Sequence, residues 1–252
     1  MNKGIYPALS GGIAYEKMLS MIANNVANIN NSGFKADRPV FKVDMPVSLP
    51  ENQGQAGNSQ VSEEGVGEVF DDKFFTEIDR TYTDFSPGVI KQTGNTLDMA
   101  IEGDGFFLVN TPDGIRYTRS GNFTLNDSNT LTTTDGYMVM GDNGPVTLEQ
   151  GKIVIDSDGG VSVNGNEVNR LRVVNPDKTA NLRKDHGNMF IGSGESRAEG
   201  YKILQGAIEL SNVNPVKEMA SMIEVLRGYE SYQKAMTTMD ETSAKANEVG
   251  RV

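Results

Sequence analysis

Residues 5–29 read IYPALSGGIAYEKMLSMIANNVANI, and this stretch decides how the chain is organised. Its apolar or small residues recur in alternating steps of three and four, which is the spacing of a coiled-coil seam. The stripe consists of Ile5, Ala8, Gly12, Tyr15, Leu19, Ile22, Val26 and Ile29. The pattern predicts a long amphipathic helix near the amino terminus.

A second amphipathic helix is predicted at the other end of the chain. It opens at Asn214 and Pro215, an N-cap residue followed by proline at the first helical position. Its apolar stripe consists of Met219, Met222, Leu226, Tyr229, Tyr232, Met236 and Met239. About thirty residues of helix span roughly 45 Å, which is longer than a domain of this size covers. The stripe therefore needs another helix or another subunit, and the pattern fits both a helical hairpin within the chain and packing between chains.

Five asparagines lie between positions 24 and 31, and asparagine is a poor helix former. One interpretation is a frayed helix end, and the other is that these short amides bond to the backbone of a packed neighbour. Because amphipathic helices with apolar stripes at both ends are typical of chains that assemble, we predict an assembly interface on the two helices. Its residues are Ile5, Leu19, Ile22, Val26, Asn24, Asn25, Asn28, Met219, Met222, Leu226, Tyr229 and Met236.

Between the helices the apolar period changes to two. Residues 46–68 contain no aromatic residue and are rich in Gly, Gln, Asn, Ser and Glu, so they are predicted to form a linker. From about Thr81 to Leu210, apolar pairs alternate between turn signals such as Asn143-Gly144 and Asn164-Gly165. The pairs are Met99/Ile101, Ile115/Tyr117, Phe123/Leu125, Tyr137/Val139, Val146/Leu148, Ile153/Ile155, Val161/Val163 and Leu171/Val173. Short strands at this spacing indicate an antiparallel sandwich or barrel.

The expected fold class is α+β, in which long terminal helices pair as a coiled-coil-like inner domain around one central antiparallel all-β domain. The expected divisions are residues 1–35 for the first helix, 36–80 for a bridging segment, 81–212 for the β domain and 213–252 for the second helix.

Composition excludes several classes of function. The chain has 252 residues and a formal charge of −11, which argues against binding nucleic acid or an anionic membrane. It contains no cysteine, which removes disulfides and thiolate chemistry. No run approaches the roughly 20 apolar residues of a membrane span. Glu16 and Lys17 interrupt the first apolar stretch, so no cleaved secretory signal is expected.

Catalytic and ligand-binding motifs are not expected either. The one histidine, His186, stands in a polar run without an adjacent nucleophile, and we assign it no role. Residues 156–167 resemble a calcium loop but place Val161 where that loop requires glycine. Gly192-Ser193-Gly194 lacks the third glycine of a dinucleotide site. We expect no enzyme activity, no metal and no cofactor.

Four segments resemble the bacterial flagellar rod, hook and axial protein family. The run Ala23 to Lys35, ANNVANINNSGFK, is similar to the family's amino-terminal signature, and Gly94 to Phe107, GNTLDMAIEGDGFF, to its central motif. Tyr117 to Phe123 and the stretch from Gln205 through Pro215 to the Met-rich end resemble two further family modules. Within the family, the length, the opening residues and the closing residues are most like those of proximal-rod subunits of the F type, and the distal-rod subunits are the alternative.

This resemblance implies a structural subunit of the flagellar rod that stacks helically around the export channel and transmits torque. The implied partners are copies of itself, other proximal and distal rod subunits, ring components of the hook–basal body and the flagellar type III export apparatus. The implied location is the periplasmic rod. A secreted surface adhesin is a less favoured alternative because neither a cleavable signal nor an anchor is expected.

Overall fold

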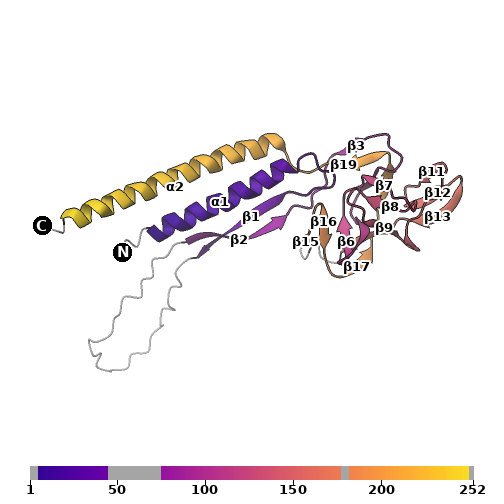
Figure 1. Ribbon diagram of the computed structural model, residues 1–252, viewed down its shortest axis with the longest axis horizontal. Coiled ribbons are helices and arrows are strands. Elements are labelled where there is room, and N and C mark those ends of the chain that lie inside the picture. Colours follow the sequence, from indigo (N-terminus) through magenta and orange to yellow (C-terminus); the bar gives the residue numbers. More distant parts are fainter. Residues whose placement is uncertain (1–4, 45–74, 177–181, 250–252) are drawn as a thin grey trace, which may run out of the picture. The chain divides into compact units, whose positions relative to one another are not determined.

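The computed structural model describes residues 5–44, 75–176 and 182–249. These residues form two helices and nineteen strands. Helix α1 spans Ile5–Ala27 and helix α2 spans Pro215–Val249, and Figure 1 shows them side by side, running in opposite directions. Asn214 caps α2 as predicted, because its side-chain oxygen accepts a hydrogen bond from the N–H of Lys217 at 3.1 Å.

The chain divides into two compact units. The first consists of the described parts of residues 1–20, 39–81 and 222–252, and the second of residues 21–38 and the described parts of 82–221. The first unit holds the outer lengths of both helices and most of a two-stranded sheet. That sheet is formed by β1 (Asp37–Asp44) and β2 (Phe75–Thr83).

The second unit is an antiparallel β domain. Its largest sheet has the order β15-β16-β6-β5-β9-β8-β7, with β10 added to β9, β14 added to β5, and β17 added to β14. The bounds are β5 Phe106–Thr111, β6 Gly114–Thr118, β7 Phe123–Leu125, β8 Leu131–Thr133, β9 Met138–Gly141, β10 Gly144–Pro145, β14 Val173–Pro176, β15 Arg183–Lys184, β16 Met189–Ile191 and β17 Glu195–Arg197.

Three smaller sheets complete the domain. A three-stranded sheet contains β11 (Ile153–Ile155), β12 (Gly160–Val163) and β13 (Asn166–Arg170). Strand β18 (Lys202–Gln205) pairs with β4 (Met99–Glu102), and β19 (Ala207–Glu209) pairs with β3 (Ile90–Gln92). The strands that lead into α2 therefore pair with the strands that open the domain.

The core of this unit is apolar and contains two large clusters. Its main cluster includes Met99, Phe107, Val109, Phe123, Leu131, Val139, Leu148, Leu171 and Val173, all of them at most 2 % exposed. A second cluster forms around Phe106, Leu108, Tyr117 and Phe190. Phe107 and Phe123 meet edge to face with ring centroids 5.3 Å apart, a favoured arrangement of aromatic pairs.

The expected α+β class, with terminal helices pairing as a coiled-coil-like inner domain, is wrong. Among the described residues most elements are strands, and no coiled-coil seam runs along the two helices. Met219 is 53 % exposed, Leu226 38 % and Met239 37 %, although each lies on the predicted seam. The compact units also cut through both helices, so that the inner end of each belongs to the β domain. The central β domain itself is present.

The physical reason lies in the face that α2 buries. Glu218 and Val225 are buried in place of Met219 and Leu226, whereas Met222, Tyr229 and Met236 are half-buried, so the inward face overlaps the predicted stripe only in part. The four expected divisions of the chain stay a prediction, and the greater part of the expected linker, residues 45–74, lies outside the described residues.

Candidate assembly interface

The side-chain amide of Asn25 is buried and joins the carboxyl-terminal end of α1 to the start of β1. The Asn25 side-chain oxygen accepts a hydrogen bond from the N–H of Asp37, and its side-chain nitrogen donates to the C=O of Asp37, both at 3.0 Å. A side-chain amide that pairs with both polar groups of one residue acts as a neighbouring strand does. Of the two interpretations of the asparagines, backbone bonding is therefore confirmed for Asn25, and the backbone belongs to the same chain.

Glu218 ties the first turn of α2 to the same place. Its carboxylate accepts a hydrogen bond from Arg38 at 2.8 Å and one from Asn25 at 3.4 Å. Glu218 is buried, and a carboxylate in the first turn also interacts favourably with the helix dipole. The inner ends of the two helices are thus joined through polar contacts.

A buried ion cluster lies where the chain enters and leaves the β domain. The Lys35 ammonium is 2.6 Å from the Glu209 carboxylate, and their side chains are 1 % and 2 % exposed. Arg119 approaches the other carboxylate oxygen at 3.4 Å and donates to the C=O of Gly103 at 2.9 Å. Burial lowers the pKa of Lys35 from its ordinary value, although the Glu209 carboxylate opposes that shift. One carboxylate here pairs with two cations.

The side-chain amide of Asn212 also links segments where the chain enters and leaves the β domain. Asn212 accepts a hydrogen bond from the N–H of Ala36 at 2.8 Å and donates to the C=O of Asp84 at 2.8 Å. Gly33 donates to the C=O of Glu209 at 2.8 Å. We call the set Lys35, Ala36, Asp84, Arg119, Glu209 and Asn212 the junction.

Two glycines permit the close approach of segments at this end of the β domain. Gly33 has a φ of +67°, and a Cβ there would lie 2.2 Å from the backbone nitrogen of Ser120. A Cβ on Gly121 would lie 1.5 Å from the C=O oxygen of Met99. No other residue fits at either position without moving backbone.

Part of α2 carries an apolar face that the described chain does not cover. Val216, Met219, Ile223 and Leu226 are all exposed, and they follow each other in steps of three, four and three. That spacing places them along one side of the helix. An uncovered stripe of large apolar side chains is a typical mark of a protein–protein contact.

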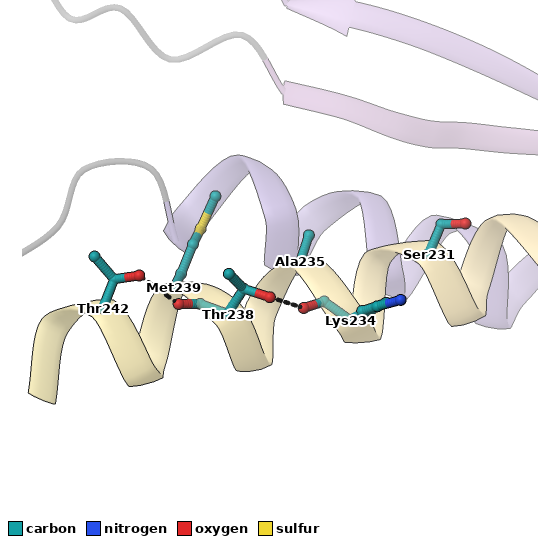
Figure 2. Close-up of a pocket in the computed structure, with 6 residues that line it drawn as sticks. All are labelled: Ser231, Lys234, Ala235, Thr238, Met239 and Thr242. Carbon is teal, nitrogen blue, oxygen red and sulfur yellow. Dashed lines mark hydrogen bonds between the residues drawn. The ribbon is translucent and has the colours of Figure 1, made fainter. Parts of the chain in front are cut away.

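Farther along α2 the surface is hollowed. Figure 2 shows the six residues that line a hollow of about 610 Å³, namely Ser231, Lys234, Ala235, Thr238, Met239 and Thr242. The hydroxyl of Thr238 donates to the C=O of Lys234 at 2.8 Å, and that of Thr242 to the C=O of Thr238 at 2.7 Å. Since both threonine hydroxyls bond within their own helix, the hollow offers packing surface and little free polar chemistry.

His186 lies beside a pair of charged side chains. The imidazole is exposed, and its Nδ1 lies 2.9 Å from Asp185, whose carboxylate also accepts a hydrogen bond from Arg116. That bond from Arg116 lowers the pKa of Asp185 below its ordinary value of 3.8. In the described ranges, no three His, Cys, Asp or Glu side chains are grouped as a metal site would require. Among the described residues, neither helix has the length and apolar content that crossing a membrane needs.

Two segments of the chain match models of known protein families. Residues 204–249 match the family model of the flagellar basal body rod FlgEFG protein C-terminal region, and residues 100–163 match that of the flagellar hook protein FlgE/F/G D1 domain. The flagellar basal-body rod protein FlgG of Bacillus subtilis is 33 % identical over 259 residues, covering 96 % of each chain. The flagellar basal-body rod protein FlgF of Caulobacter vibrioides is 32 % identical over 254 residues, covering 98 % of each chain. The chain belongs to the flagellar basal-body rod protein family.

As a member of this family, the chain is a structural subunit of the basal-body rod, and its place is the flagellar basal body. The matched segments coincide with the features described above. The C-terminal model covers Glu209, Asn212, Glu218 and all of α2, and the D1 model runs from the second residue of β4 to the end of β12.

The structure places the predicted interface residues of this rod protein in several environments. Ile22 and Asn25 are buried within the chain, whereas Asn24, Met219 and Leu226 are exposed. The half-buried members are Leu19, Val26, Asn28, Met222, Tyr229 and Met236. Ile5 begins α1, and its side chain lies outside the described part. Their role in assembly stays a prediction.

Sequence reasoning missed the junction. Lys35 and Glu209 are 174 positions apart, and neither stands in a pattern that marks a buried charge. The available signal was the run Gly33-Phe34-Lys35 directly after the helix, because a lysine next to buried aromatic and glycine residues needs a partner.

Proposed function

We propose that this rod subunit lies in the proximal rod and assembles through the uncovered apolar face of α2. Met219, Ile223 and Leu226 carry this proposal, because large apolar side chains in contact with water gain free energy when a neighbouring subunit covers them. The neighbours would be copies of this chain and the other proximal and distal rod subunits. The proximal position is favoured by the resemblance of the opening and closing residues, and the distal rod is the alternative.

Assembly into a rod would give the subunit a mechanical role. Copies stacked helically would form a tube around the export channel, and the tube would transmit torque from rotor to hook. The subunit would reach the periplasmic rod through the flagellar type III export apparatus without losing an amino-terminal signal, and ring components of the hook–basal body would lie beside it.

A charged substitution in the apolar face tests the role of α2. Leu226→Asp is expected to give a folded, exported subunit that does not join the rod, because burying an unpaired carboxylate in an interface costs at least several kcal/mol. Leu226→Met is the matched control, since it keeps a large apolar side chain at the same position of the helix and should assemble normally. Swimming on soft agar and the amount of subunit in purified basal bodies are measured. Normal incorporation of the Leu226→Asp chain would refute the proposed face.

Position and export need separate measurements. A density map of basal bodies in which this subunit carries a tag should show the tag in the proximal rod, and a tag in the distal rod would select the alternative. Mass spectrometry of the subunit from basal bodies should recover the peptide that begins near Met1. A cleaved amino terminus would contradict the proposed route.

A further inference from the structure

Two glycines and two tyrosines pack against one another between α1 and α2 in the first compact unit. The ring of Tyr15 lies over Gly228, and the ring of Tyr232 lies over Gly11. The two rings also contact each other, with centroids 5.3 Å apart and planes inclined at 46°. Each helix therefore contributes one glycine and one tyrosine to a reciprocal contact, which we call the glycine–tyrosine lock.

The lock leaves no room for a larger side chain at either glycine. A Cβ on Gly11 would lie 2.6 Å from Cε1 of Tyr232, and a Cβ on Gly228 would lie 2.5 Å from Cε1 of Tyr15. Carbon atoms in van der Waals contact have an optimal separation of about 3.5–4.0 Å. By contrast, a Cβ on Gly12 would meet nothing within 4 Å. A side chain at Gly11 or Gly228 would therefore displace the opposite ring, whereas Gly12 carries no such constraint.

Such a contact specifies alignment in a way that an ordinary apolar seam does not. Leucine and methionine stripes repeat every turn and tolerate a shift of one helix past the other. Two rings seated over two glycines fit in one alignment only, since a shift of one turn would place each ring against a residue that has a side chain. This explains how two helices without a coiled-coil seam can keep a defined relation.

The lock also determines which way α2 presents its apolar face. At about 100° per residue, Ile223 and Leu226 lie about 140° and 160° around the helix from Gly228. Because Gly228 faces α1, these two side chains face away from it, in agreement with their exposure. Loss of the lock would change both the position of the apolar face along α1 and the direction in which that face points.

We propose that Gly11, Tyr15, Gly228 and Tyr232 are the residues that set the register between α1 and α2 and so hold the assembly face in its working orientation. The register itself is a property of the single subunit. The assembly half of the inference rests on the proposed role of α2 in the rod.

Register can be read by cross-linking, because the chain contains no cysteine of its own. Met18→Cys with Val225→Cys places thiols one turn along from the Tyr15–Gly228 contact, and these are expected to form a disulfide in the full-length subunit. Met18→Cys with Met222→Cys reports a register shifted by about one turn and should cross-link poorly. Gly11→Ala or Gly228→Ala is expected to abolish the first cross-link, whereas Gly12→Ala should retain it. An unchanged first cross-link in both alanine variants would overturn the lock.

A rescue variant covers the case in which Gly11→Ala prevents folding. Adding Tyr232→Ala removes the opposing ring, so the double variant should regain helix content by circular dichroism if the clash was the cause. Failure of this rescue would overturn the assignment of the ring as the obstacle.

The assembly half is tested in cells. Gly11→Ala and Gly228→Ala should reduce swimming and rod incorporation, and Gly12→Ala should not. Normal rods built from subunits whose first cross-link is lost would refute the link between register and assembly. If instead Leu226→Asp assembles normally, the proposed face fails while the cross-linking result on the lock stands.

Discussion

Asn25 holds Asp37 by both of its backbone polar groups, each at 3.0 Å, so a single amide joins the end of α1 to the start of β1. If the Asn25 amide is removed, the N–H and the C=O of Asp37 each lose this hydrogen bond. The contact connects two elements that are adjacent in sequence but run in different directions.

Asn25→Ala should therefore lower the free energy of unfolding by about 1–3 kcal/mol, the usual result of leaving buried polar groups unsatisfied. Asn24→Ala is the matched control, because Asn24 is exposed and its substitution should change stability by less than about 0.5 kcal/mol. Urea unfolding of the isolated subunit measures both. Equal effects of the two substitutions would contradict the role assigned to the buried amide.

Glu209→Gln should cost roughly 3–5 kcal/mol, because it leaves Lys35 and Arg119 as buried cations without a carboxylate. Glu199→Gln removes an exposed carboxylate and should be close to neutral. Thermal unfolding followed by circular dichroism compares them. A stable Glu209→Gln chain would show that the junction does not hold the β domain closed.

Gly33→Ala should destabilise the subunit more than Gly94→Ala. Both glycines have a positive φ, at +67° and +77°, so both substitutions share a strain of roughly 1–2 kcal/mol. Only the Cβ at position 33 meets backbone, whereas the space around position 94 is empty within 4 Å. Overpacking there should add about 1–3 kcal/mol. Similar unfolding midpoints for the two variants would refute the close approach of residue 33 to Ser120.

Asp185→Asn provides a test that depends on pH. The pKa of Asp185 is lowered in the folded chain by its hydrogen bond from Arg116, so the carboxylate stabilises the fold at pH values above its ordinary pKa of 3.8. That contribution is lost as the pH falls through the lowered pKa. The difference in unfolding free energy between the parent and Asp185→Asn should be largest near neutral pH and should vanish in acid. A difference that does not change with pH would exclude this ion pair as its source.

The sequence pattern predicted α1 and several strands because local periodicity carries that information. Strands β4, β6, β7, β11 and β12 lie where the alternating pairs placed them. Val146 and Leu148 alternate equally well and are fully buried, yet no strand includes them. Burial on one side of an irregular segment produces the same pattern as a strand, so periodicity alone does not separate them.

Strands β1 and β2 were missed for a different reason. They belong to the segment expected to bridge the helix and the β domain, and β1 contains Pro39, which reads as a strand breaker. The two strands pair only with each other in the described structure, an arrangement in which a proline is tolerated.

The inward face of α2 and the interface residues could be predicted only in part. Met222, Tyr229 and Met236 do face partly inward, but Glu218 and Val225 replace Met219 and Leu226 there. The buried position of Glu218 depends on Arg38 and Asn25, which are 180 and 193 positions away, and no local pattern reports such partners. The glycine–tyrosine lock likewise became visible only when the two ends of the chain were placed together.

The junction has a consequence for how tension travels through the chain. Residues 33–35 and 209–212 are pinned to each other by the Lys35–Glu209 pair and by backbone bonds, so the β domain between them is a closed loop. A pull that separates α1 from α2 would meet this pin before it reached any strand of the large sheet. The β domain is therefore bypassed by such a load, and its loops can lengthen or change without weakening the strut formed by the two helices.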